Sequence, residues 1–184
     1  MKEINKELIK VNRDCDAILV PGGEKVVLVE GTHVRITQAL GGDFTVYVNG
    51  NLLKISGKDA DAIGMSIKKD SIKTDKITSN RKITDQDAWE IMKTCYDPEI
   101  PVNVVDLGLI YDLKMIDSGK SITINVKMTL TAPGCGMGPV IAQDVEDKLM
   151  GLPNVINVQV ELVWDPVWNQ SMMTDSAKLE LGML

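Results

Sequence analysis

Cys135 is the residue of this sequence that is best placed to do chemistry. It lies in a glycine-rich segment, 129–139, between an alternating apolar run and a helical apolar pattern. The first turn of a helix offers unpaired N–H groups and a positive dipole end, which favour a thiolate nearby. The flanking glycines, Gly134 and Gly136, leave the sulfur unshielded by neighbouring side chains. The sequence therefore predicts an accessible cysteine that can serve as a nucleophile or as a metal ligand.

The other two cysteines are not expected to do chemistry. Cys95 continues an apolar stripe that begins at Ala88 with helical spacing, so we expect it in the core. Cys15 lies between two aspartates, which disfavour a thiolate, and is given no role. The cysteines form no Cys-x-x-Cys pair, which argues against a disulfide framework and against a self-contained zinc site.

The second half of the chain supplies the elements that would position Cys135. Apolar periodicity predicts, in order, a helix from Thr84 to Asp97, strands over 107–115 and 122–130, a helix over 139–149 and a strand over 158–164. The first two strands form a hairpin with one apolar face, and the strand–helix–strand order makes a right-handed crossover. We therefore predict a two-layer α/β domain, in which both helices cover one face of a three-stranded mixed sheet.

The first half reads as a separate, β-rich domain, so the expected fold class is α+β. Short β-branched runs between residues 17 and 55 alternate with glycine turns, and Asn49-Gly50 is a strong hairpin signal. These runs predict a small β-barrel or sandwich over 1–65, a polar linker over 66–82 and the α/β domain over 83–184. Asp59 and Asp61 are expected at a helical turn for electrostatic reasons rather than as metal ligands.

Composition narrows the classes of partner. The chain has 184 residues and a net charge of −6, and it shows no basic stripe interleaved with aromatic residues, which argues against nucleic-acid binding. It contains no run of about 18 apolar residues and no signal-peptide pattern at its start, so we expect no membrane partner and a cytoplasmic location. The expected partners are proteins, metals or small molecules.

Three segments resemble the iron-sulfur cluster assembly domain family: 97–111, which begins Asp97-Pro98-Glu99, then 129–135, and finally 163–168. The preceding β-rich half resembles a longer form of that family, associated with the SUF system, so that the resemblance extends over nearly the whole chain. It implies a role in maturing iron–sulfur proteins, with the assembly machinery and client apoproteins as partners. It also implies that Cys135 is the reactive cysteine and that its polar neighbours are Glu99, Asp106, Thr129 and Thr131.

Cluster chemistry constrains that role. Iron–sulfur clusters are usually held by four thiolates, which one exposed cysteine cannot supply. A homodimer with two copies of Cys135 would hold iron or a cluster only transiently, with Asp106, Glu99 or an outside thiol as further ligands. Each of these carboxylates has a plainer alternative as a turn residue. The hydroxyls of Thr129 and Thr131 are expected either to hydrogen-bond the sulfur or simply to fill the strand.

The C-terminal region adds a candidate docking surface. Trp164 belongs to the apolar alternation of the last strand and is expected in the core, whereas Trp168 is expected on an exposed surface that docks a partner. The segment 174–184 reads as a short helix with more apolar surface than a free tail should expose. We expect it to dock on the domain or on a partner.

Two alternatives stay open beside the maturation role, which is not an enzymatic one. In the first, Cys135 is the nucleophile of an acyl-transfer or persulfide-transfer enzyme, which requires a nearby base. His33 is the single histidine and lies in the β-rich half, so Asp106 would have to act as that base. In the second, the chain is an adaptor that docks client proteins without thiol chemistry.

Overall fold

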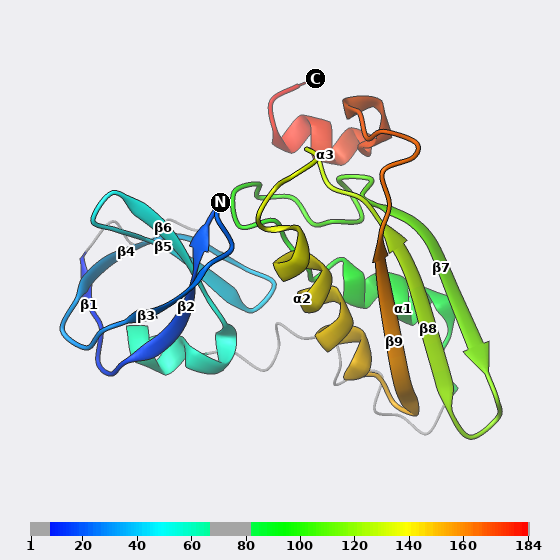
Figure 1. The fold of residues 1–184 in the computed structure, drawn as a ribbon, viewed down its shortest axis with the longest axis horizontal. Helices are drawn as coiled ribbons and strands as arrows, with labels where there is room; N and C mark the ends of the chain where they lie inside the picture. Colours follow the sequence, from blue (N-terminus) through cyan, green and yellow to red (C-terminus); the bar gives the residue numbers. More distant parts are fainter. Residues whose placement is uncertain (1–7, 67–81, 184) are drawn as a thin grey trace. The chain divides into compact units, whose positions relative to one another are not determined.

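The computed structural model describes residues 8–66 and 82–183, and the chain divides into two compact units, Met1–Ile72 and Lys73–Leu184 (Figure 1). Nearly all of the linker expected over 66–82 lies outside the described residues. The domain boundaries at 65 and 83 therefore stay predictions. Within the described parts of the chain, no helix has the length and apolar character needed to cross a membrane.

The first unit is built on one antiparallel sheet. Its strands are β1 (Ile9–Lys10), β2 (Cys15–Val20), β3 (Lys25–Leu28), β4 (His33–Leu40), β5 (Asp43–Val48) and β6 (Asn51–Ile55), arranged in the order β1-β4-β5-β6-β2-β3. The expected hairpin joins β5 to β6, where Asn49 (φ 48°) and Gly50 (φ 86°) take the positive φ angles of a type I′ turn. The described pairings leave β1 and β3 at the edges, so closure into a barrel or sandwich stays a prediction.

The sheet of this unit is curled (Figure 1), and its buried apolar residues form one core cluster. Val34, Val46 and Ile55 on three neighbouring strands are fully buried there. The 3-10 helix η1 (Gly57–Ile63) adds Ala62 and Ile63 to the same cluster and ends at a left-handed glycine. Buried apolar residues of these strands and of η1 therefore form the core of this unit, and the strands themselves are those that the β-branched runs predicted.

The second unit contains the expected three-stranded mixed sheet with helices. Its elements are α1 (Asp85–Met92), β7 (Ile110–Asp117), β8 (Ile122–Met128), α2 (Gly138–Met150), β9 (Val155–Leu162), the 3-10 helix η4 (Gln170–Met172) and α3 (Asp175–Glu180). The central strand β8 pairs antiparallel with β7 and parallel with β9. Every second residue of β8, from Ile122 to Met128, is buried, and α1 and α2 pack on this unit's sheet.

Local sequence signals account for the first helix. The carboxylate of Asp87 accepts hydrogen bonds from the Thr84 backbone N–H at 2.8 Å and from the Thr84 hydroxyl at 2.9 Å, which fixes the helix start. Ala88, Ile91 and Met92 face the core, and Cys95 just beyond the helix is fully buried, as expected. Cys95 is therefore a core residue.

Both ends of the predicted sheet need correction. The strand expected from residue 107 begins at Ile110, because Leu107 and Leu109 are buried in a turn that precedes it. The strand expected to reach Trp164 ends at Leu162, and Trp164 is 43% exposed rather than part of the core. In each case the apolar alternation continues into a loop that is packed by other means.

Candidate functional site

Cys135 lies in the loop that joins β8 to α2, three residues before the first residue of that helix. Its carbonyl accepts a hydrogen bond from the Gly138 N–H at 3.1 Å, and its own N–H donates to the Ala132 carbonyl at 3.4 Å. Cys135 is partly exposed, whereas Cys15 and Cys95 are buried. It is thus the only solvent-accessible cysteine, and all three cysteines fall within the described residues.

Close packing fixes the end of this loop. A Cβ at Gly138 would stand 2.5 Å from Leu130 Cδ1, so the first residue of α2 lies directly against the residue that leaves β8. Met137 beside it is fully buried. Gly134 takes φ +81°, a left-handed conformation that glycine tolerates, and a Cβ there would meet open space. The backbone around Cys135 is therefore anchored on one side and open on the other.

Asp106 belongs to a turn that its own neighbours stabilise. Its Oδ2 accepts a hydrogen bond from Asn103 Nδ2 at 2.6 Å. Asn103 Oδ1 in turn accepts the backbone N–H groups of Val105 at 3.1 Å and Asp106 at 2.9 Å, which closes an Asx-type turn. This arrangement matches the turn alternative for Asp106, and sequence reasoning missed Asn103. An asparagine three residues before an aspartate was the available signal.

The other three polar residues lie in different settings. Glu99 is exposed in the turn after α1, where its N–H donates to Asp97 Oδ1 at 2.8 Å. Thr129 is buried just after β8, and its backbone N–H donates a hydrogen bond to the Leu109 carbonyl at 2.8 Å. Thr131 is half-buried in the loop. Among the described residues, no three His, Cys, Asp or Glu side chains gather as a metal site. The roles expected for these residues around the sulfur stay predictions.

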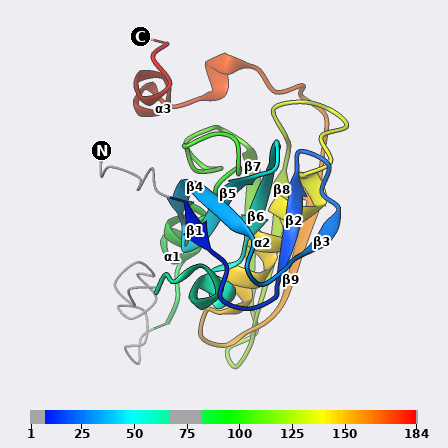
Figure 2. The same ribbon diagram turned by 90° about the vertical axis from the view of Figure 1, so that its left-hand side faces the viewer.

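The C-terminal segment packs on the turn that contains Asp106. The Thr174 N–H donates to the Asp106 carbonyl at 2.9 Å, and the Trp168 indole N–H donates to the Leu107 carbonyl at 2.9 Å. A Cβ at Gly108 would meet the Met172 carbonyl oxygen at 2.2 Å, so glycine permits this close approach. Figures 1 and 2 show α3 lying beyond the 97–109 loop. The start of the tail thus docks within this unit, as expected, whereas Leu179 and Met183 further along it stay 67% and 46% exposed.

The sequence prediction was wrong for both tryptophans: Trp164 is more exposed than expected and Trp168 is more buried. Trp164 is 43% exposed, whereas Trp168, expected on an open docking surface, is half-buried with its indole N–H bonded to the backbone. The chain bends between them at Asp165 and Pro166. Alternation could not predict these environments because it ends where the strand ends.

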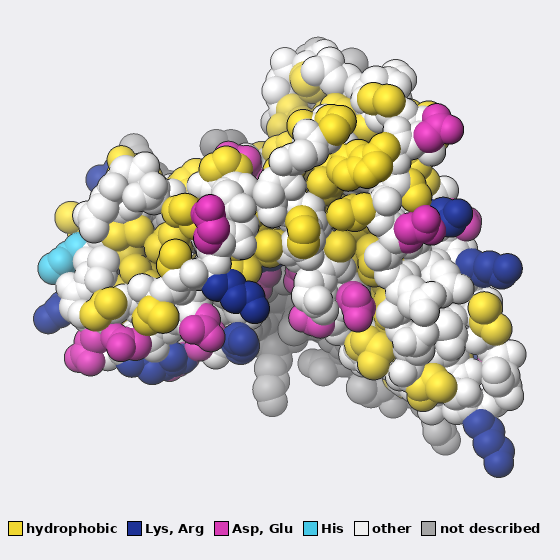
Figure 3. All heavy atoms as spheres, viewed as in Figure 1, with side chains coloured by type: hydrophobic (Ala, Val, Ile, Leu, Met, Phe, Trp, Pro, Cys, Tyr) yellow, Lys and Arg dark blue, Asp and Glu magenta, His cyan; other side chains and the backbone are white. Residues whose placement is uncertain are grey.

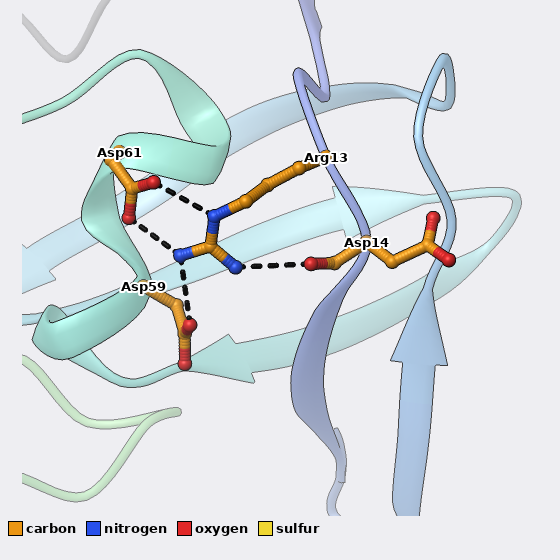
Figure 4. Close-up of polar contacts among 4 residues, drawn as sticks. All are labelled: Arg13, Asp14, Asp59 and Asp61. Carbon is orange, nitrogen blue, oxygen red and sulfur yellow. Dashed lines mark hydrogen bonds and ion pairs between the residues drawn. The ribbon is translucent and has the colours of Figure 1, made fainter.

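Asp59 and Asp61 form an ion-pair site in the first unit (Figure 4). Arg13 donates to both oxygens of Asp61, at 2.8 and 2.6 Å, and to Asp59 Oδ1 at 3.0 Å. The side-chain hydrogen bond to Arg13 holds the pKa of Asp61 below its usual value, and the same bond raises the pKa of Arg13. The two carboxylates thus bind an arginine of the same chain, in keeping with the structural role expected for them.

Cys15 lies near this ion-pair site but is shielded from solvent. It is 4% exposed, and burial raises the pKa of its thiol, with the nearby Asp59 carboxylate acting in the same direction. Both effects favour the neutral thiol. This environment agrees with the expectation that Cys15 does no chemistry.

Comparison with known proteins shows which family the second unit is similar to. Residues 85–161 match the family described as iron-sulfur cluster assembly protein. Over 101 residues the chain is 46% identical to an Fe-S protein maturation auxiliary factor of Porphyromonas gingivalis, covering 55% of this chain and 93% of that protein. It is 40% identical to the Fe-S protein maturation auxiliary factor SufT of Staphylococcus aureus over 47% of this chain and 96% of that protein.

A solved structure of a domain of unknown function from Bacillus anthracis is 33% identical, covering 54% of this chain and 92% of that one, with a TM-score of 0.48. The family match begins at the first residue of α1, ends within β9 and includes Cys135. It leaves out the six-stranded sheet and the segment after β9. The similarity is therefore narrower than the nearly whole-chain resemblance expected from the sequence.

Proposed function

The chain belongs to the iron-sulfur cluster assembly protein family, and on this premise we propose that it is an accessory factor in iron–sulfur protein maturation in which Cys135 transiently holds iron or a cluster. The printed names of the relatives, maturation auxiliary factors, support the role in maturation. The same names describe auxiliary factors rather than enzymes, which favours a non-catalytic role. The proposed partners are the assembly machinery and the client apoproteins that receive the cargo.

The accessibility of one thiol is the observation on which the proposal rests. Cys135 is partly exposed in a loop anchored at Gly138, while Cys15 and Cys95 are 4% and 0% exposed. A thiol must reach solvent to accept iron or cluster from a donor protein and to pass it on. Cys135 alone meets that requirement among the three cysteines.

Incomplete ligation suits a carrier that must release its cargo. A cluster usually takes four thiolates, and one chain offers one accessible thiol. We propose that two chains associate so that two copies of Cys135 share the cargo, with Asp106, Glu99 or an outside thiol as further ligands. Asp106 is already oriented by Asn103, and only its second carboxylate oxygen is without that bond. Thr129 and Thr131 are proposed to polarise the sulfur from the same loop.

Anaerobic reconstitution with iron and sulfide tests the proposal. The wild-type chain should bind iron and develop the visible absorption of iron–sulfur chromophores, and Cys135→Ser should lose both. Cys15→Ala is the matched control because it removes a buried thiol, and it should load as the wild type does. Iron loading of Cys135→Ser at the wild-type level would contradict the proposal.

A further inference from the structure

A groove of about 680 Å³ opens in the second unit, away from the loop of Cys135. Three parts of the chain form it: the start of β7, the end of β8 and the segment after β9. Its lining residues are Gly108, Ile110, Tyr111, Asp112, Lys127, Val163, Asp165, Pro166 and Met172. Neither Cys135 nor any of its four expected neighbours lines this groove, so the thiol site leaves it unassigned.

The walls of the groove are held in place by bonds within the unit. The Tyr111 hydroxyl donates to the Pro166 carbonyl at 2.8 Å and contacts Met172 Sδ at 3.5 Å. The Met172 backbone also lies against Gly108, where a Cβ would overlap its carbonyl oxygen at 2.2 Å. These contacts join the C-terminal segment to the start of β7. The groove is therefore formed before any ligand arrives, which lowers the entropic cost of binding.

The charges in the groove are mostly negative. Asp112 and Asp165 line it and are exposed, and their carboxylates have no hydrogen bond or ion pair with other described residues. The single cation, Lys127, lies 3.8 Å from the carboxylate of Glu161 and stands opposite Asp112 in the sheet register. The net field therefore attracts a cationic group.

The remainder of the surface is apolar. Ile110, Val163 and Pro166 contribute apolar side chains to the lining, and Trp164 and Val167 beside them are 43% and 69% exposed. Figure 3 shows hydrophobic side chains gathered where β9 ends and the C-terminal segment begins. An exposed apolar patch with carboxylates at its rim is typical of a surface that binds another protein.

The shape of the site favours an extended ligand. The groove begins at Ile110–Asp112, the first residues of β7, and β7 is the edge strand of the order β7-β8-β9. Among the described strands β7 has a neighbour on one side only, so its outer backbone groups can pair with an added strand. A segment that pairs there would lead directly into the groove.

We propose that this groove docks an extended peptide segment of a partner protein that presents a lysine or arginine beside apolar side chains. The cation lies between Asp112 and Asp165, and the apolar side chains cover Val163 and Trp164. Building on the proposed maturation role, the groove would hold a client or an assembly protein while Cys135 handles the cargo. The thiol site and the docking groove are then separate functions of one unit.

Fluorescence anisotropy with two labelled peptides tests the proposal. The peptides share the same apolar residues and differ only in carrying lysine or glutamate at the same positions. At low ionic strength the lysine peptide should bind about tenfold more tightly than the glutamate peptide, and salt should reduce the difference. The double variant Asp112→Asn, Asp165→Asn should lose about tenfold in affinity for the lysine peptide. The matched control, Glu146→Gln with Asp147→Asn on α2, removes the same number of charges outside the groove and should bind as the wild type does.

Several outcomes would overturn the proposal that this groove docks a peptide. Equal binding of the two peptides, or unchanged affinity in the double variant, would do so. Amide NMR shifts that map outside Ile110, Lys127 and Val163 would also do so. Saturation of the groove by ferrous iron or by a second copy of the chain would identify another occupant. The two proposals fail separately, because Cys135→Ser should keep peptide binding and the double variant should keep iron loading.

Discussion

At the scale of single residues, the candidate site depends on glycines that allow close approach. Gly138 admits Leu130 beside the start of α2, and Gly108 admits the Met172 backbone beside the Asp106 turn. Gly108 also takes φ +71°, a conformation that residues with a Cβ rarely adopt. The position of Asp106 and the path of the C-terminal segment are thus fixed by the same missing side chain.

Gly108→Ala should therefore destabilise the second unit by about 3 kcal/mol, because the left-handed backbone and the overlap with Met172 add. Chemical denaturation measures the loss. Gly119→Ala is the matched control, because Gly119 has φ +84° with nothing within 4 Å of an added Cβ. That control should lose only about 1 kcal/mol. Equal losses in the two variants would show that the contact with Met172 contributes nothing.

At the scale of elements, local signals predicted those parts of the fold that local bonds determine. The capping pair of Thr84 and Asp87, the hairpin at Asn49-Gly50 and the alternation along β8 were all read from neighbouring residues. The start of β7 and the environments of Trp164 and Trp168 were not, because they depend on partners far away in sequence. The indole of Trp168, for example, binds a carbonyl 61 residues earlier.

The same limit applies to the candidate site. The loop of Cys135 could be predicted because its glycines and the following helix are adjacent in sequence. The contacts of Asp106 divide in two: Asn103 is a near neighbour in sequence and offered a signal that was missed, whereas the bond from the Thr174 N–H comes from a distant segment and could not be predicted. The groove residues Asp112 and Asp165 carry no sequence pattern that would join them. They come together only when the segment after β9 folds back onto β7.

The ion pairs of Arg13 with Asp59 and Asp61 predict how the stability of the first unit changes with pH. Because the ion pair with Arg13 lowers the folded pKa of Asp61, its stabilisation is complete above the unfolded carboxyl value, about 3.9. It is lost as the pH falls through the lowered value. Arg13→Gln should therefore reduce the thermal midpoint of the first unit at pH 7 by a small amount, as for other exposed pairs.

Thermal unfolding at a series of pH values checks this prediction. The difference in thermal midpoint between wild type and Arg13→Gln should become smaller as the pH falls below about 4. Lys10→Gln serves as a control, since it removes an equal charge from β1 and leaves the ion pairs of Arg13 intact. A difference that stays constant into acid would mean that the guanidinium acts by packing rather than by charge.

At the scale of the whole molecule, the six-stranded unit lies outside the matched residues, while Cys135 and its loop lie inside them. The second unit also has its own core, built on β8 and the two helices. We therefore predict that residues 82–184 fold cooperatively without the first unit and load iron through Cys135 as the full chain does. Circular dichroism and anaerobic reconstitution of the truncated chain measure both.

The full-length Cys135→Ser chain is the comparison for loading, and the full-length wild type is the comparison for stability. A truncated chain that folds but no longer loads iron would assign part of the cargo site to the first unit. A truncated chain that fails to fold would place the domain boundary elsewhere. In that case a longer chain that begins at residue 66 decides between the two explanations.

The bonds from Trp168 and Thr174 to the Asp106 turn also affect how the chain folds during synthesis. The residues that hold this turn, Trp168 and Thr174, follow it by more than sixty positions, so a ribosome releases them well after the turn itself. During synthesis α1, β7 and β8 are therefore complete before the two residues that bond to this turn have been made. A half-made chain therefore exposes Cys135 before the Asp106 turn has its C-terminal support, and cargo taken up at that stage would bind to an incompletely folded domain.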